Sequence, residues 1–133
     1  IPNIWSIGGF SLSDNSAYAC EPFVTTKEAG GFVRNGQIKN IFAINSRKKT
    51  KNEEADRLLD FIWKNFNMLP FALRWITKEW EEKKARELLD ILVKKKTVQA
   101  YPVLIEVNEQ RVAQAEHTFI PNETGATVTT KTL

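Results

Sequence analysis

The sequence predicts an α+β fold in which a block of helices interrupts a series of strands. Apolar and polar residues alternate along 17–26 (AYACEPFVTT), as they do in a half-buried strand. From about residue 53 the apolar positions take helical spacing, and from residue 98 the period returns to two. This order favours an α+β domain, or a mixed α/β domain with a helical insertion.

The first third is predicted to hold a loop and several strands. Residues 1–15 are rich in Gly, Ser and Asn and indicate a loop, and residues 18–25 indicate a strand. The pairs Gly30-Gly31 and Asn35-Gly36 then flank a short, hairpin-like element. The next strand is expected over Ile38–Ile44, where apolar and polar positions alternate only in part.

The middle of the chain is predicted to contain three helices. Thr50 followed by Glu53 has the spacing of a capping box at the start of the first. Leu69-Pro70 ends that helix, and a short second one is expected over Pro70–Ile76. The third, from about Lys78 to Lys95, has glutamates at its start and lysines at its end, as the helix dipole favours. Apolar stripes mark the first and third helices: Ala55, Leu58, Leu59, Ile62 and Phe66, then Ala85, Leu88, Leu89 and Leu92.

The last third is predicted to return to strands. The expected elements are a strand over Val98–Val107 interrupted by Pro102, a turn at Asn108-Glu109, a strand over Arg111–Ile120, a turn at Asn122–Gly125 and a strand over Ala126–Thr130.

Composition is that of one soluble globular domain. The 133 residues are 42% hydrophobic and 26% charged, and no apolar run approaches the roughly 18–20 residues of a membrane span. The single cysteine, Cys20, excludes an internal disulfide and fits a reducing compartment. Net charge is +3, with clusters at Arg47–Lys51 and Lys94–Lys96, an excess too mild to predict a nucleic-acid partner. The chain opens on IPNIW without an initiator Met, so we expect a fragment of a longer protein.

Two glutamates in apolar strands are the candidate chemical groups. Glu116 lies mid-strand in VAQAEHTFIP, and Glu21 has the same setting in AYACEPFVTT. A carboxylate there needs a partner if it is buried, and a cation is the natural one. Two glutamates alone do not make a metal site, because a catalytic metal pair takes about five side-chain ligands. From the residues alone, a metal site and ordinary surface or strand-end glutamates both stay open.

Strand geometry separates Glu116 from its neighbour His117. Side chains alternate faces, so Glu116 shares a face with Gln114 and Thr118, while His117 points the other way. We therefore predict that His117 is a structural histidine or supports its own face, and that Glu and His do not clamp one ion. Cys20 is expected to pack in the core, since its own strand offers no histidine to activate the thiol.

Six segments, in order, resemble the C-terminal part of a type II methionine aminopeptidase of the archaeal kind. They are IPNI, CEPFVTT, LPFALRW, AYPVL, VAQAEHTFI and TVTT, and together they cover essentially the whole chain. The motifs are specific in combination: Glu21-Pro22-Phe23, Leu69–Trp75, Tyr101–Leu104 and Ala113–Thr118.

The resemblance implies a fold, a reaction and cofactors. The family has the pita-bread fold, a curved antiparallel sheet flanked by helices, and removes the initiator methionine with two divalent metal ions, which can be Co, Mn, Fe or Zn. The helical block at about residues 47–97 corresponds to the insertion that distinguishes type II enzymes. The implied localisation is cytoplasmic, and the implied substrates are peptides or nascent proteins with an N-terminal Met.

The resemblance also implies roles for four residues. Glu21 matches the glutamate that binds one metal, and Glu116 matches the carboxylate that bridges both. Tyr101 matches the tyrosine at the rim of the methionine pocket, and Ile41 is placed in its lining. The remaining two Asp ligands, the His ligand and a further catalytic His precede Ile1 in the family. With two of five ligands, this chain is expected to be inactive alone and to need the N-terminal portion of the enzyme as a second chain.

One alternative is a catalytically inactive relative with the same fold that binds nucleic acid or the ribosome. The helical block followed by a hairpin resembles a winged helix, and the lysine clusters flank it. Lysines at a helix C-terminus are, however, ordinarily solvated charge matched to the dipole. A prolidase-like enzyme would also keep two glutamates, but the AQAEHT motif and the long insertion fit it poorly.

Overall fold

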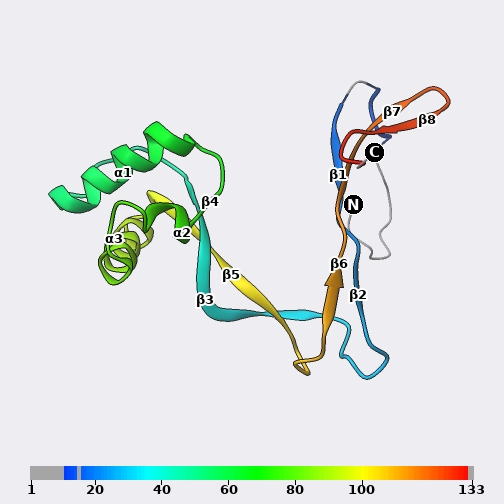
Figure 1. Cartoon of the computed structure of the whole chain (residues 1–133), viewed down its shortest axis with the longest axis horizontal. Coiled ribbons are helices and arrows are strands. Elements are labelled where there is room, and N and C mark those ends of the chain that lie inside the picture. The colour runs from blue at the N-terminus through cyan, green and yellow to red at the C-terminus, as the bar shows by residue number, and fades with distance from the viewer. Residues whose placement is uncertain (1–10, 15, 132–133) are drawn as a thin grey trace. The chain divides into compact units, whose positions relative to one another are not determined.

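The computed structural model describes residues 11–14 and 16–131, which fall into two compact units. The first unit comprises 1–32 and 106–133, and the second comprises 33–105. Helices and antiparallel strands both occur (Figure 1), so the mixed α and β composition is confirmed. The predicted loop over 1–15 lies, apart from 11–14, outside the described residues.

The first unit is made of antiparallel strands. Its elements are β1 (Tyr18–Cys20), β2 (Phe23–Thr25), β6 (Val112–Gln114), β7 (His117–Asn122) and β8 (Gly125–Val128). They form a three-stranded sheet in the order β1-β7-β8 and a two-stranded sheet β2-β6. The predicted turn at Asn122–Gly125 is confirmed, because these two residues pair and close a hairpin between β7 and β8.

Each of the two long strands predicted here is divided in two. The first is interrupted at Glu21-Pro22, and its partner at Ala115-Glu116. Proline has no N–H to donate, so the ladder loses a hydrogen bond at this point. The Pro22 carbonyl still accepts from the Ala115 N–H at 3.2 Å, which holds the two strands together across the break.

The second unit contains a sheet in the order β4-β3-β5, built from β3 (Val33–Ile44), β4 (Phe71–Ala72) and β5 (Val98–Glu106). The hairpin predicted near Asn35-Gly36 is wrong, since β3 runs straight through it. A Cβ added to Gly36 would lie 2.9 Å from both Ile105 Cδ1 and the Val103 carbonyl oxygen, so this glycine permits close strand packing, not a turn. The predicted interruption at Pro102 is also absent, because β5 is an edge strand and tolerates a missing donor.

Three helices follow β3, and their starts differ from prediction. α1 spans Glu53–Phe66, α2 Leu73–Ile76 and α3 Glu82–Lys94. The predicted capping box is wrong: Asn52 caps α1 by accepting from the Ala55 N–H, and Thr50 instead bonds the Asp56 carboxylate. α2 starts later than predicted because Phe71 and Ala72 pair with β3.

α3 also starts later than predicted. Glu81 caps it, and its carboxylate accepts from the Lys83 and Lys84 N–H groups. Residues 77–79 instead form a turn after α2, and the Glu79 and Trp80 N–H groups bond the Ile76 carbonyl.

The buried apolar core lies in the second unit. The predicted stripes of α1 and α3 pack there against the sheet, with Phe71 stacked between Phe42 and Phe66 at ring distances of 6.0 and 5.3 Å. In the described part of the first unit, no apolar side chain is fully buried, and Phe23 and Val24 are 55% and 63% exposed. No helix among the described residues is both long enough and apolar enough to cross a membrane.

Candidate metal centre

The two candidate glutamates occupy facing positions in the first unit. β1 pairs with β7 as Cys20↔His117, and β2 pairs with β6 as Phe23↔Gln114. The two ladders have the same register, so continuing either one across the break sets Glu21 opposite Glu116. Directly opposed residues of an antiparallel pair have Cβ atoms about 4.5–5.5 Å apart.

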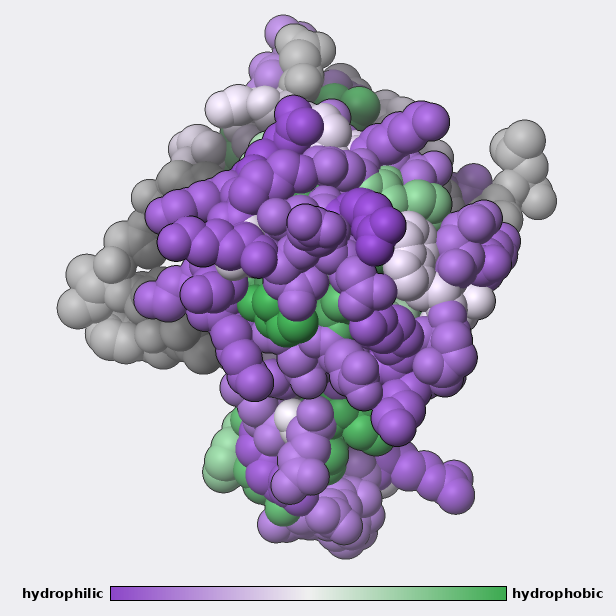
Figure 2. Space-filling model, turned by 90° about the vertical axis from the view of Figure 1, so that its left-hand side faces the viewer, coloured by the Kyte–Doolittle hydropathy of each residue, from purple (hydrophilic) through white to green (hydrophobic). Residues whose placement is uncertain are grey.

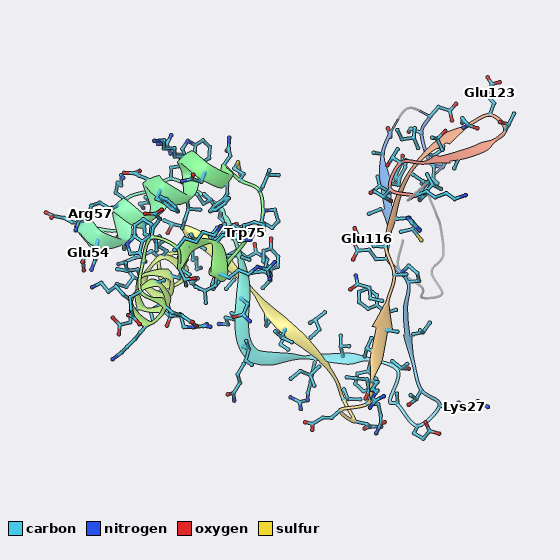
Figure 3. The ribbon with its side chains drawn as sticks, viewed as in Figure 1. Lys27, Glu54, Arg57, Trp75, Glu116 and Glu123 are labelled. Atoms are coloured by element: carbon cyan, nitrogen blue, oxygen red, sulfur yellow. The ribbon has the colours of Figure 1, made fainter. Side chains whose placement is uncertain are left out.

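A side-chain hydrogen bond shows which face carries the pair. The Gln114 Nε2 donates to the Glu21 Oε2 at 3.3 Å. Gln114 and Glu116 are two residues apart and share a face of the strand, as the sequence predicts. Glu21 and Glu116 therefore belong to the same face of this ladder, and Figure 3 shows Glu116 at the junction between β6 and β7.

The electrostatics of this pair favour a cation. Like charges placed directly opposite each other in a sheet are destabilising. Both glutamates are exposed here, which lets water screen the repulsion. Carboxylate oxygens are the donors that hard divalent ions take, so the chemistry of the pair fits a metal ion.

The number of donors is smaller than a metal pair needs. Among the described residues, no group of three or more His, Cys, Asp and Glu side chains gathers at one point. Glu21 and Glu116 provide two positions, against the about five ligands that a catalytic metal pair takes. Further ligands are required from elsewhere for such a centre.

His117 lies outside the glutamate pair, as predicted. Its Nδ1 is 3.1 Å from the Thr130 Oγ1, and the same hydroxyl oxygen accepts from the Thr118 N–H. The ring is thus fixed by the chain segment after β8, which supports a structural role.

The expectation for Cys20 is wrong. Its thiol is exposed, because the described residues do not cover that side of the ladder. Its register partner is His117, which comes from the facing strand. Reasoning from its own strand alone missed this neighbour, and only the pairing of β1 with β7 reveals it.

Tyr101 and Ile41 both lie in the second unit. Tyr101 is on β5 and 40% exposed, and Ile41 is on β3 and 42% exposed. Ile41 lines a pocket of about 230 Å³ together with Ala72, Leu73 and Arg74 of the LPFALRW motif. Tyr101 is not among the residues that line this pocket.

One carboxylate that the sequence analysis did not single out has a strong structural role. Glu106 is 2% exposed and accepts from four backbone N–H groups, those of Gly30 (2.6 Å), Asn108 (2.8 Å), Gly31 (3.2 Å) and Gln110 (3.2 Å). Burial disfavours its charged form, but these donors outweigh burial and hold the pKa of Glu106 below its usual 4.5. The sequence pattern that indicates this role of Glu106 is a charged residue at the end of an apolar strand, together with a Gly-Gly pair elsewhere in the chain.

Comparison with known proteins shows what this chain is similar to. No protein-family profile matches the chain. The methionine aminopeptidase of Methanocaldococcus jannaschii is 35% identical over 98% of this chain and 43% of its own length, and that of Saccharolobus solfataricus is 38% identical over 100% and 44%. The chain is therefore related, along nearly its whole length, to archaeal methionine aminopeptidases, and it spans less than half the length of these relatives.

A solved structure shares the fold. The structure of a thermophilic Arx1 superimposes with a TM-score of 0.73 at 20% identity, over 95% of this chain and 33% of that one. At this identity the likeness concerns the fold alone.

Proposed function

We propose that this chain is the C-terminal part of a type II methionine aminopeptidase of the pita-bread fold. In this proposal Glu21 and Glu116 are two of five metal ligands, and Glu116 bridges both ions. The observation that carries the proposal is the facing register of these glutamates, with the Gln114 amide bonded to Glu21. The relatives that match the chain at 35–38% identity support the same activity.

The proposal needs a second portion of the enzyme. The N-terminal portion would supply the remaining ligands, two Asp and one His, and the further catalytic His. The exposed apolar side chains of the first unit support such a partner, because Phe23, at 55% exposure, shares the face of Glu21. Covering that face would exclude water from the carboxylates and strengthen their hold on a cation.

The chemistry follows from the carboxylate pair. Divalent ions such as Co, Mn, Fe or Zn, held by Glu21, Glu116 and the ligands of the N-terminal portion, would supply a nucleophilic water near neutral pH and Lewis-acid polarisation of a peptide carbonyl. Glu21 and Glu116 would hold the ions through hard oxygen donors, and their charge would offset part of the charge of the centre. Tyr101 is proposed at the rim of the methionine pocket and Ile41 in its lining, in a cytoplasmic enzyme that acts on nascent proteins with an N-terminal Met.

The facing glutamates favour this proposal over an inactive relative that binds nucleic acid or the ribosome. Two opposed carboxylates with no ion to hold would only weaken the ladder. A protein that only binds nucleic acid or the ribosome would gain nothing from this destabilisation of the ladder.

Metal titration calorimetry on the chain assembled with its N-terminal portion tests the proposal. We expect Glu21→Gln and Glu116→Gln each to weaken Mn²⁺ or Co²⁺ binding by more than the about 10–100-fold typical of residues that only support a ligand. Glu116→Gln should also abolish release of methionine from Met-initiated peptides. The matched control is Glu123→Gln, in the exposed turn between β7 and β8 (Figure 3), which should change neither readout. Undiminished metal affinity in Glu116→Gln would contradict the bridging role.

A further inference from the structure

The two lysine clusters of the sequence meet at one pocket in the second unit. The pocket has a volume of about 270 Å³ and is lined by Lys48, Lys49, Thr50, Lys51, Lys95 and Thr97. The first cluster precedes α1 and the second ends α3, so the fold joins charges that are far apart in sequence. Figure 2 views the molecule from the side of α1 and α3 and shows that hydrophilic side chains dominate this face.

Backbone hydrogen bonds fix the two segments against each other. The Asn45 and Ser46 N–H groups donate to the Thr97 carbonyl at 2.9 and 3.2 Å. Thr97 is buried, and its N–H and hydroxyl both bond the Leu92 carbonyl at the end of α3. The pocket is therefore built on hydrogen-bonded backbone, and lysine side chains from two segments line it.

The positive charge of the pocket is only partly neutralised. Lys49 pairs with Asp60 at 2.7 Å, and the Asp56 carboxylate is engaged by Thr50. In the described part of the chain, no ion pair is formed by Lys48, Lys51 or Lys95. Glu53 and Glu54 begin α1 after this segment, and Glu54 is bound to Lys84.

The helix dipole does not account for this arrangement. A dipole explains the lysines at the end of α3, but Lys48 and Lys51 precede a helix N-terminus, where positive charge is unfavourable. Arg47 extends the positive surface, with its guanidinium 4.6 Å from the centre of the Trp63 ring.

We infer that this pocket binds the phosphodiester backbone of a nucleic acid. Lysine ammonium groups on flexible stems attract phosphates as point charges and carry no base selectivity. The cations extend past the pocket along both segments, which suits a polymer with regularly spaced phosphates better than one small anion. The net charge of +3 conceals this site because it averages over the whole chain, whereas binding depends on local clustering.

The test is fluorescence anisotropy of the 133-residue chain with labelled single-stranded RNA and DNA of one sequence. Between 50 and 200 mM KCl we expect the logarithm of affinity to fall with a slope of about −2 to −3 against the logarithm of salt, at about 0.7 per phosphate contact on a single strand. Lys48→Glu combined with Lys95→Glu should weaken binding at least about tenfold and reduce the slope by about one or more. RNA and DNA bound alike would indicate backbone recognition alone, and a preference for RNA would identify the source of the phosphates.

The matched control is Lys27→Glu combined with Lys78→Glu, two exposed positions outside the pocket. It makes the same change in net charge and should keep affinity within about twofold, since only contacts to phosphate set the salt-dependent term. Equal losses in both double variants, no binding by the unaltered chain at 50 mM salt, or a preference for anionic lipid vesicles would overturn the inference. Circular dichroism and a Lys48→Gln/Lys95→Gln pair separate loss of binding from loss of fold. Peptidase activity plays no part in this test.

Discussion

Three glutamates of the first unit show how surroundings decide what a carboxylate does. Glu106 is buried and surrounded by four N–H donors, so its charge is fully used in holding two turns together. Glu21 and Glu116 are exposed, and the bond from Gln114 leaves most of their lone pairs available. The first arrangement is structural, and the second suits the pair of metal ligands that we propose.

Replacing Glu106 by Gln should lower the free energy of unfolding at pH 7. The charge-assisted hydrogen bonds of the carboxylate are replaced by weaker bonds to a neutral amide. The NH₂ group of the amide is itself a donor, and it is placed against backbone N–H donors. Because folding lowers the pKa of Glu106, its contribution is present above the unfolded value and is lost as pH falls through the lower, folded pKa. The difference in free energy of unfolding between the unaltered chain and Glu106→Gln, measured from urea unfolding curves, should therefore shrink below about pH 4.5. A gap that is constant with pH, or equal to that of Glu123→Gln, would contradict this account.

At the residue scale, the sequence predicted the faces of the strand correctly but not the partners across it. The alternation of faces placed Glu116 with Gln114 and against His117, because that period is local. The neighbours of Cys20 and Glu106 depend on register and on distant glycines, which no local pattern contains. Glu21 and Glu116 could be singled out because a charge in an apolar strand is visible in the sequence alone.

Among the elements, the apolar stripes of the sequence predicted helices α1 and α3 but did not predict where these helices start. Thr50 and Asn52 both carry side chains that can cap a helix, and Asn52 provides the cap of α1 while Thr50 bonds Asp56. Strand lengths were also mispredicted, because the effect of a residue depends on the elements that pair with its strand. Gly36 and Pro102 act as chain breakers in isolation but are accommodated in a paired sheet.

Asn52→Ala should destabilise the second unit by about 1 kcal/mol, since it removes the cap of α1. Asn52→Asp keeps an acceptor in place, and a carboxylate also suits a helix N-terminus, so stability should be retained. Thermal unfolding followed by circular dichroism measures both changes. If Asn52→Ala unfolds like the unaltered chain, the assigned cap is wrong.

Across the whole chain, the two units differ in how far their apolar side chains are buried. The second unit has a buried core of helices and sheet, whereas in the described part of the first no apolar side chain is fully buried. The archaeal relatives are more than twice as long as the segment that aligns with this chain. In the function that we propose, the metal centre is completed by the N-terminal portion of the enzyme.

The most direct measurement is a complementation assay on a Met-initiated peptide with Mn²⁺ or Co²⁺. This chain and the N-terminal portion of the enzyme are assayed separately and after co-expression. The account predicts no methionine release by either part alone and release by the combination, lost again with Glu116→Gln. Activity of this chain alone, or an active combination that tolerates Glu116→Gln, would contradict the claim that Glu21 and Glu116 form part of a shared metal centre.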